Sequence, residues 1–187
     1  MAWFLLFLHL FLFHFPSFFS SSSSFNFSCH HYESSALLHF KSSFTINHDY
    51  LCDGYPLLKT ATWKNETDCC SWDGVTCDTI IGHVIGLNLG CEGLQKLNPN
   101  STLFHLAYIQ KLNLSNNNFS GSYFHSKFGG FLSLTHLDLS RSFFKGEIPT
   151  QISHLRKLQS LQLFGSYQRN LVWKETTLKR LEGVVYR

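Results

Sequence analysis

The residues with the most informative chemistry in this 187-residue chain are six cysteines, two of which, Cys69 and Cys70, are adjacent. Thiolates either bind zinc or form disulfides, and the redox compartment decides between the two. Cys69 and Cys70 with Cys77 imitate part of a zinc site. However, an apolar leader precedes them, so an oxidising compartment and disulfides are favoured. An adjacent pair strains disulfide geometry, so Cys69 and Cys70 are expected to bond to different partners, and several connectivities stay open.

The other reactive residue types lack the spacing that catalysis or metal binding needs. The 11 histidines share no metal-ligand spacing, and Asp138 and Glu147 are carboxylates without a partner for acid–base work. No Gly-x-Ser-x-Gly, phosphate-binding loop or kinase signature is present. The net charge is only +3, without a basic run that would bind nucleic acid. We therefore predict a protein that is not an enzyme and has neither metal nor cofactor.

Five Asn-x-Ser/Thr sequons indicate a secreted glycoprotein. Asn26 lies beside the expected cleavage point of the leader. At least two of the others, Asn65, Asn100, Asn113 and Asn118, are expected to carry glycan.

The first 24 residues read as a secretory signal peptide, cleaved near Ser24. Residues 3–19 are nearly all apolar, and a serine run follows at 20–24. No Lys or Arg precedes the apolar segment, so an uncleaved signal anchor is the alternative. Because Pro16 and the serines shorten the segment below the roughly 20 residues of a spanning helix, cleavage is favoured.

A phrase of the form Leu-x-Leu recurs at a nearly constant interval and predicts the fold. Its first leucines are Leu87, Leu112, Leu137 and Leu161, so the steps are 25, 25 and 24 residues. This period is typical of leucine-rich repeats. Residues 82–181 are therefore predicted to form an α/β solenoid of about four repeats, the fourth irregular.

Within each repeat the two leucines of the phrase should point inward from a short strand, and the residues around them should face solvent. Asn117 is placed to hydrogen-bond successive backbones. In the third repeat Ser142 stands at that place, where a weaker or water-mediated bond is expected. The outward positions form a candidate concave ligand-binding face, although solvated polar residues without a ligand are the plainer interpretation. These positions are Asn88, Lys111, Asn113, Asn116, Thr135, His136, Asp138, Arg141, Gln159, Ser160 and Gln162. A glycan on Asn113 would shield part of this face.

Residues 25–81 are predicted to form a cap that covers the bare side of the first repeat. Glu33–Lys41 has helical spacing, with Ser34 or Ser35 as its N-cap. Residues 45–60 read as loop.

At the other end, Leu171–Leu181 is predicted to be an amphipathic helix on the convex side. Residues 182–187 are predicted to be a non-repeat tail. An uncovered last repeat exposes apolar surface, so we interpret the chain as a truncated product or an incomplete gene model.

The cap motif resembles a known family. Ala36–Lys41, Trp63 and Cys69–Cys77 resemble the N-terminal cap of plant extracellular leucine-rich-repeat proteins. With Cys52, Cys91 and the residue pattern of the repeats included, the chain is most similar to receptor-like proteins of the Cf disease-resistance class. The resemblance implies the disulfides Cys29–Cys69 and Cys70–Cys77, and we take Cys52–Cys91 as the third pair. The phrase Gly146–Pro149 is similar to the plant-specific repeat, which implies a second short strand on the convex side.

The function implied by this resemblance is extracellular recognition in pathogen perception and defence signalling. The expected partners are a protein or peptide ligand and a receptor kinase. The expected location is the secretory pathway and the plasma membrane, reached through a C-terminal span that this chain lacks, or secretion if the chain is complete. The alternatives are a secreted inhibitor of cell-wall hydrolases, the ectodomain of a receptor kinase, and a non-functional truncated product.

Overall fold

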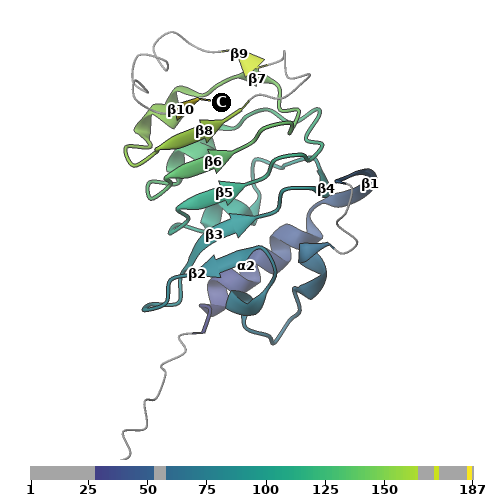
Figure 1. Cartoon of the computed structure of the whole chain (residues 1–187), viewed down its shortest axis with the longest axis vertical. Coiled ribbons are helices and arrows are strands. Elements are labelled where there is room, and N and C mark those ends of the chain that lie inside the picture. The colour runs from purple at the N-terminus through teal and green to yellow at the C-terminus, as the bar shows by residue number, and fades with distance from the viewer. Residues whose placement is uncertain (1–27, 53–57, 164–170, 173–184, 187) are drawn as a thin grey trace, which may run out of the picture.

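The computed structural model describes residues 28–52, 58–163, 171–172 and 185–186, which form a curved stack of coils with a cap at one end (Figure 1). The predicted signal peptide, the Asn26 sequon, residues 173–181 of the predicted helix and most of the predicted tail lie outside these residues. Within them, no helix combines the length and apolarity that a bilayer span needs.

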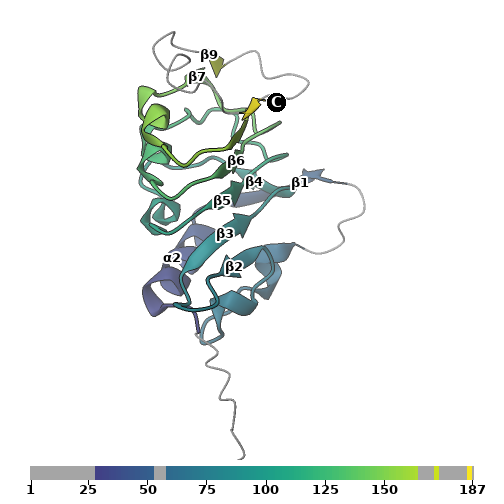
Figure 2. The same cartoon turned by 60° about the vertical axis from the view of Figure 1, so that its left-hand side comes forward.

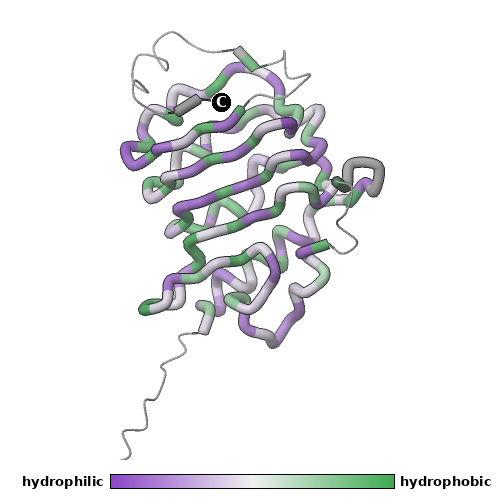
Figure 3. The backbone as a smooth tube through the Cα atoms, in the orientation of Figure 1, coloured by the Kyte–Doolittle hydropathy of each residue, from purple (hydrophilic) through white to green (hydrophobic). Residues whose placement is uncertain are grey.

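One face of the stack is a sheet of parallel strands, one from each repeat. β3 (Val84–Asn88), β5 (Lys111–Asn113), β6 (His136–Asp138) and β8 (Ser160–Gln162) pair in that order. The recurring leucines of the Leu-x-Leu phrase pair with one another across these strands and are buried. Polar residues flank the leucine on both sides in β5, β6 and β8, whereas Gly86 and Asn88 flank it in β3 (Figure 3). The predicted solenoid of leucine-rich repeats is therefore confirmed.

Short 3-10 helices form the opposite side of the coils: η3 (Thr102–His105), η4 (Ser126–Gly130) and η5 (Thr150–His154). Phenylalanines fill the space between them and the sheet. Phe119 stacks on Phe144 with ring centroids 4.8 Å apart, and Phe128 meets Phe104 edge-on at 5.3 Å. Such aromatic contacts contribute about 1 kcal/mol each beyond the area they bury.

Polar side chains at one position of successive coils bind the coils to each other. Asn117 is fully buried; its amide donates to the Leu89 carbonyl at 2.7 Å, and its Oδ1 accepts from the Leu94 N–H at 2.9 Å. Ser142 donates directly to the Leu114 carbonyl at 2.7 Å, so of the two expectations for this position the water-mediated bond was wrong. A hydroxyl reaches the carbonyl because adjacent coils are close enough at this point.

The first coil has Glu92 at this position, and that carboxylate faces the cap. It accepts bonds from the Lys59 N–H at 2.8 Å and from the Thr60 N–H and hydroxyl at 3.2 and 3.0 Å. These groups belong to η1 (Lys59–Thr62). The column of buried polar residues therefore extends from the cap into the repeats.

Two neighbouring glycines offer a matched test of coil packing. A Cβ on Gly129 would overlap the Gln151 backbone of the next coil, with the carbonyl carbon only 2.6 Å away, whereas Gly130 has open space around it. Gly129→Ala is expected to destabilise the protein by about 1–3 kcal/mol, because backbone must move to admit the methyl group. Gly130→Ala is the control and should cost much less. Thermal unfolding of both variants checks this; equal losses would contradict it.

The cap is built on α2 (His31–Ser42), which lies across the end of the stack (Figures 1 and 2). Leu37 and Phe40 on its inner face are buried. The helix starts earlier than predicted, with His30 as its N-cap residue, so the assignment of Ser34 or Ser35 as N-cap was wrong. The Ser34 hydroxyl instead donates to the His31 carbonyl within the first turn.

A strand replaces part of the predicted loop 45–60. β1 (Thr45–Leu51) pairs antiparallel with β4 (Glu92–Gln95). This pairing was missed because it joins segments far apart in the sequence, and the Cys52–Cys91 disulfide holds them together. Residues 53–57 of that loop lie outside the described residues.

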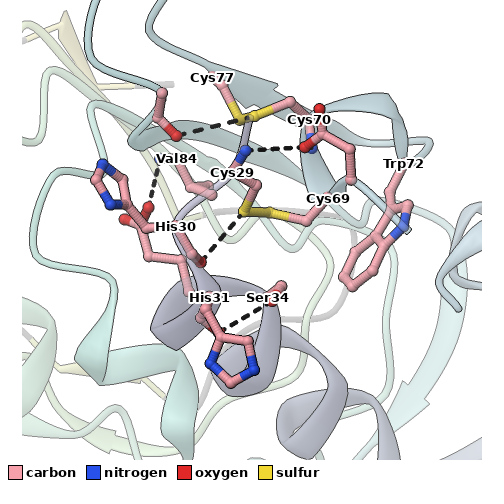
Figure 4. Close-up of a disulfide and its surroundings, with 12 residues drawn as sticks. Cys29, His30, His31, Ser34, Cys69, Cys70, Trp72, Cys77 and Val84 are labelled. Carbon is pink, nitrogen blue, oxygen red and sulfur yellow. Dashed lines mark hydrogen bonds between the residues drawn. A yellow bond between two sulfur atoms is a disulfide. The ribbon is translucent and has the colours of Figure 1, made fainter. Parts of the chain in front are cut away.

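Three disulfides staple the cap: Cys29–Cys69, Cys70–Cys77 and Cys52–Cys91, the same pairs that the sequence interpretation gave. The adjacent cysteines of η2 (Cys69–Ser71) bond in opposite directions, one to the segment before α2 and one to β2 (Val75–Cys77) (Figure 4). β2 pairs antiparallel with β3 and so joins the cap to the main sheet. Trp63 stacks on Trp72 at 5.5 Å beneath these bonds.

The end of the chain differs from the sequence prediction in two places. Leu171 and Val172 are not helical but form β9, which pairs with β7 (Gly146–Glu147), so β7 is the implied second short strand. Val185 and Tyr186 form β10, which pairs parallel with β8. Tyr186 pairs with Leu161, 25 residues earlier, so the repeat period continues into the segment predicted to be a non-repeat tail.

Candidate ligand-binding face

The outer face of the parallel sheet carries a shallow hollow of about 470 Å³. It lies across β2, β3, β5, β6 and β8, so residues from the cap and from every repeat strand line it. The lining residues are Thr76, Ile85, Gly86, Leu87, Asn88, Gln110, Lys111, Leu112, Asn113, His136, Leu137, Asp138, Ser160 and Gln162.

Seven of the predicted face residues come together in this hollow: Asn88, Lys111, Asn113, His136, Asp138, Ser160 and Gln162. The other four predicted residues are Asn116, Thr135, Arg141 and Gln159, and none of them lines it. Asn116 and Arg141 occupy the turns after the strands, where their φ angles are 53° and 52°. The Thr135 hydroxyl is bound to the Gln110 carbonyl at 2.8 Å.

Sequence reasoning did not assign Thr76, Ile85 and Gln110 to this face. Gly86 and the strand leucines Leu87, Leu112 and Leu137 line the hollow as well. Ile85 and Gln110 hold the same repeat position as Thr135. The sequence interpretation assigned this position to the face only in the last two repeats, as Thr135 and Gln159. Thr76 lies in β2, which the sequence interpretation treated as part of the cap. The alternation Val75-Thr76-Cys77 was the available signal, because it places Thr76 on the outer face if the segment is a strand.

The polar groups of the hollow are held in fixed positions by the strand ends. Asn88, Asn113 and Asp138 each accept a hydrogen bond on Oδ1 from the N–H two residues later, at 3.2, 2.8 and 2.9 Å. The His136 ring is positioned by the Thr135 hydroxyl, 2.9 Å from Nδ1. A Cβ on Gly86 would lie 3.0 Å from the Cβ of Thr76, so the absence of a side chain there keeps this part of the hollow open. The face is therefore preorganised, which lowers the entropy cost of binding.

The polar groups of the hollow can form hydrogen bonds with a ligand. Amides and hydroxyls make up most of its polar groups, Lys111 and Asp138 are its two formal charges, and the lining residues include no Phe, Tyr or Trp. In the described part of the chain, the one cluster of metal-ligand type is Cys29, Cys69 and Cys70, whose sulfurs are already in disulfides.

The four sequons of the described chain lie in two kinds of environment. Asn65 and Asn100 are exposed, whereas Asn113 and Asn118 are half-buried and accept bonds from the N–H of their sequon serines at 2.8 and 3.1 Å. We expect Asn65→Gln and Asn100→Gln each to remove one glycan from the secreted protein. Gel mobility before and after glycosidase digestion checks this; unchanged mobility of both variants would contradict it.

Comparison with known proteins identifies relatives for both the cap and the repeats. Residues 30–78 match the family described as "Leucine rich repeat N-terminal domain", and residues 108–128 and 133–155 match "Leucine Rich Repeat". The chain is 42% identical over 149 residues to Receptor-like protein 6 of Arabidopsis thaliana, which covers 75% of the chain. It is 45% identical over 163 residues to Receptor-like protein Cf-9 of Solanum pimpinellifolium, which covers 81%. The matched region spans only 15% and 19% of these two relatives.

Solved structures show the same architecture. The leucine-rich-repeat ectodomain of the Arabidopsis thaliana membrane receptor kinase GASSHO1/SCHENGEN3, in complex with CASPARIAN STRIP INTEGRITY FACTOR 2, superposes with a TM-score of 0.60 at 27% identity. The match covers 81% of this chain and 17% of that one.

Proposed function

Because this chain belongs to the plant extracellular leucine-rich-repeat receptor-like proteins, we propose that it is a recognition module in pathogen perception and defence signalling. The observation that carries this proposal is the preorganised hollow on the outer face of the sheet, to which the cap and all four repeats contribute. Relatives named as receptor-like proteins favour this function over a secreted hydrolase inhibitor.

The chemistry of the hollow indicates a protein or peptide ligand. Amide side chains such as those of Asn88, Gln110 and Gln162 can donate hydrogen bonds to a peptide backbone and accept them from it. Neighbouring strands present such groups about 4.8 Å apart. Sugars are usually held by stacking on Trp, Tyr or Phe rings, and none of these residues lines the hollow. Signalling at the plasma membrane, through a partner receptor kinase, completes the proposal.

The test uses the secreted, glycosylated chain, immobilised and exposed to size-fractionated extracellular fluid from infected and uninfected leaves. A fraction from infected leaves should bind and should lose binding after protease digestion. Lys111→Ala with His136→Ala should lower its affinity about tenfold or more, because both side chains line the hollow.

The control is Lys127→Ala, which removes an exposed lysine of η4 outside the hollow. Three results would overturn the proposal: a binder that resists protease, equal losses in the hollow and control variants, or a bound hydrolase that the chain inhibits. Leaves that express the full-length protein should also respond to the active fraction with a burst of reactive oxygen.

A further inference from the structure

Five large apolar side chains are exposed along one lateral edge of the solenoid, where the chain enters each strand. Among the described residues, only one other large apolar side chain, Tyr123, is as open to solvent. The five have exposed fractions between 43% and 70%. Exposed apolar side chains that gather at one place are typical of a surface that another molecule covers. They are Tyr32, Ile80, Ile81, Tyr108 and Leu132.

The two tyrosines are held in place by the ring of His83. That ring stacks on His30 at 4.0 Å and on Tyr108 at 3.8 Å, and its Nδ1 lies 3.2 Å from the Tyr32 hydroxyl. The same nitrogen is 3.3 Å from the buried carboxylate of Glu33. Rings from the cap and from two coils are therefore fixed before any partner arrives.

The two isoleucines are presented by a closed turn. The Asp78 carboxylate accepts from the Ile80 and Ile81 N–H groups at 2.8 and 3.0 Å, and these bonds lower the pKa of the Asp78 carboxyl. The Ile81 carbonyl lies 2.9 Å from Nε2 of His30. The exposed side chains of this turn are Thr79, Ile80 and Ile81, so most of its outer surface is aliphatic.

The same edge continues along the repeats and changes from apolar to basic. Each later strand follows a turn closed by a backbone bond over three residues, as from the Ile109 N–H to the Leu106 carbonyl, and the turns before Leu134 and Leu158 are equivalent. The parallel register places these turns side by side. Their tips are Ala107 and Tyr108, then Leu132 and Ser133, then Arg156 and Lys157. The edge thus runs from an apolar cap end to two exposed basic residues.

We propose that this lateral stripe docks a partner protein whose contacting segment is apolar at the cap end and acidic at the other end. The stripe consists of Tyr32, Ile80, Ile81, Tyr108, Leu132, Arg156 and Lys157. Rigid aromatic and aliphatic anchors supply affinity at such surfaces, and complementary charge fixes the orientation of the partner.

Other occupants fit this surface less well. Further coils of the same solenoid add to the sheet beyond β8, as β10 does, and so do not cover its side. A second copy would place basic residues on basic residues in a parallel arrangement, and basic residues on apolar ones in an antiparallel arrangement. The sequons at Asn65, Asn100, Asn113 and Asn118 are not stripe residues, so a glycan is not attached within the stripe.

A random-peptide display library, selected on the secreted chain, tests the proposal. Enriched peptides should combine aliphatic or aromatic residues with a cluster of Asp or Glu. A synthetic copy of an enriched peptide should bind about tenfold or more weakly to Ile80→Ser/Leu132→Ser and to Arg156→Glu/Lys157→Glu. The loss in the charge-reversed variant should shrink as salt rises.

Lys111→Ala/His136→Ala, in the hollow, is the control and should leave the affinity of this peptide unchanged. Melting temperatures of all variants must match that of the parent chain, and any variant that unfolds is replaced by its single substitutions. The proposal is overturned if no peptide is enriched, if enriched peptides lack acidic residues, or if binding ignores the stripe substitutions. Self-association that Ile80→Ser/Leu132→Ser abolishes would also overturn it, in favour of a second copy.

Discussion

Replacing Cys29 and Cys69 by serine is expected to destabilise the protein by about 4 kcal/mol. The bond closes a loop with a sequence separation of 40 residues, and the chain-entropy account assigns that stabilisation to a loop of this length. Cys69 is fully buried beside the stacked pair Trp63 and Trp72. Loss of the bond also frees the start of α2, so the end of the first coil becomes exposed to water. Secretion yield and thermal unfolding measure the effect.

The matched comparison is Cys70→Ser with Cys77→Ser. Its sequence separation is only 7 residues, so the same account assigns it about 2 kcal/mol. The double variants should therefore rank in this order, with the Cys29/Cys69 variant the less stable. If the two lost equal stability, loop closure would not explain the role of these bonds, and local packing of the cysteines would have to.

Asn117→Ala is expected to cost about 3 kcal/mol, a large effect for one polar side chain. Its amide bonds the carbonyls of Leu89, Leu114 and Ser115, and its oxygen accepts from the Leu94 N–H. The Leu114 and Ser115 carbonyls keep bonds from Ser142 and Cys91. The buried Leu89 carbonyl and Leu94 N–H lose their Asn117 partner, at a cost of roughly 1–3 kcal/mol each, partly offset by relaxation. Denaturant unfolding of the secreted protein checks the value.

Ser142→Ala is the natural comparison, because Ser142 occupies the same place one coil later. Its hydroxyl bonds one carbonyl of the preceding coil, that of Leu114, so its loss should cost about 1 kcal/mol. Asn117→Ser should fall between these two variants. An Asn117→Ala protein as stable as Ser142→Ala would show that water replaces the amide and that the column contributes little.

The repeat architecture was predictable because its signal is periodic. Leu112 and Leu137 are buried and paired as their spacing requires, and Asn117 forms the bonds expected of it. The limits of α2 and the strand β1 were not predictable in the same way. β1 exists through its pairing with β4, in which the partners Thr45 and Gln95 are 50 residues apart, and a local pattern carries no signal for such a partner.

The candidate face was likewise predictable only in part. Outward positions within strands, such as Lys111 and Asp138, line the hollow because alternation fixes their direction. Positions in the turns beyond the strands, such as Asn116 and Arg141, do not line it, because a left-handed turn conformation redirects the chain there. The edge that presents Tyr108 and Leu132 had no sequence signal, since exposure of an apolar residue becomes visible only in three dimensions.

The positions of the disulfides also have a consequence for the order of events during synthesis. All six cysteines precede residue 92, so every bond of the cap can close before the ribosome has delivered β5. N-terminal parts fold first as a chain emerges, and a solenoid can grow from any formed unit. The oxidised cap then presents the free edge of β3 to β5, and each later strand pairs with the one before it. The rate of disulfide formation therefore sets the earliest moment at which the recognition surface can begin to assemble.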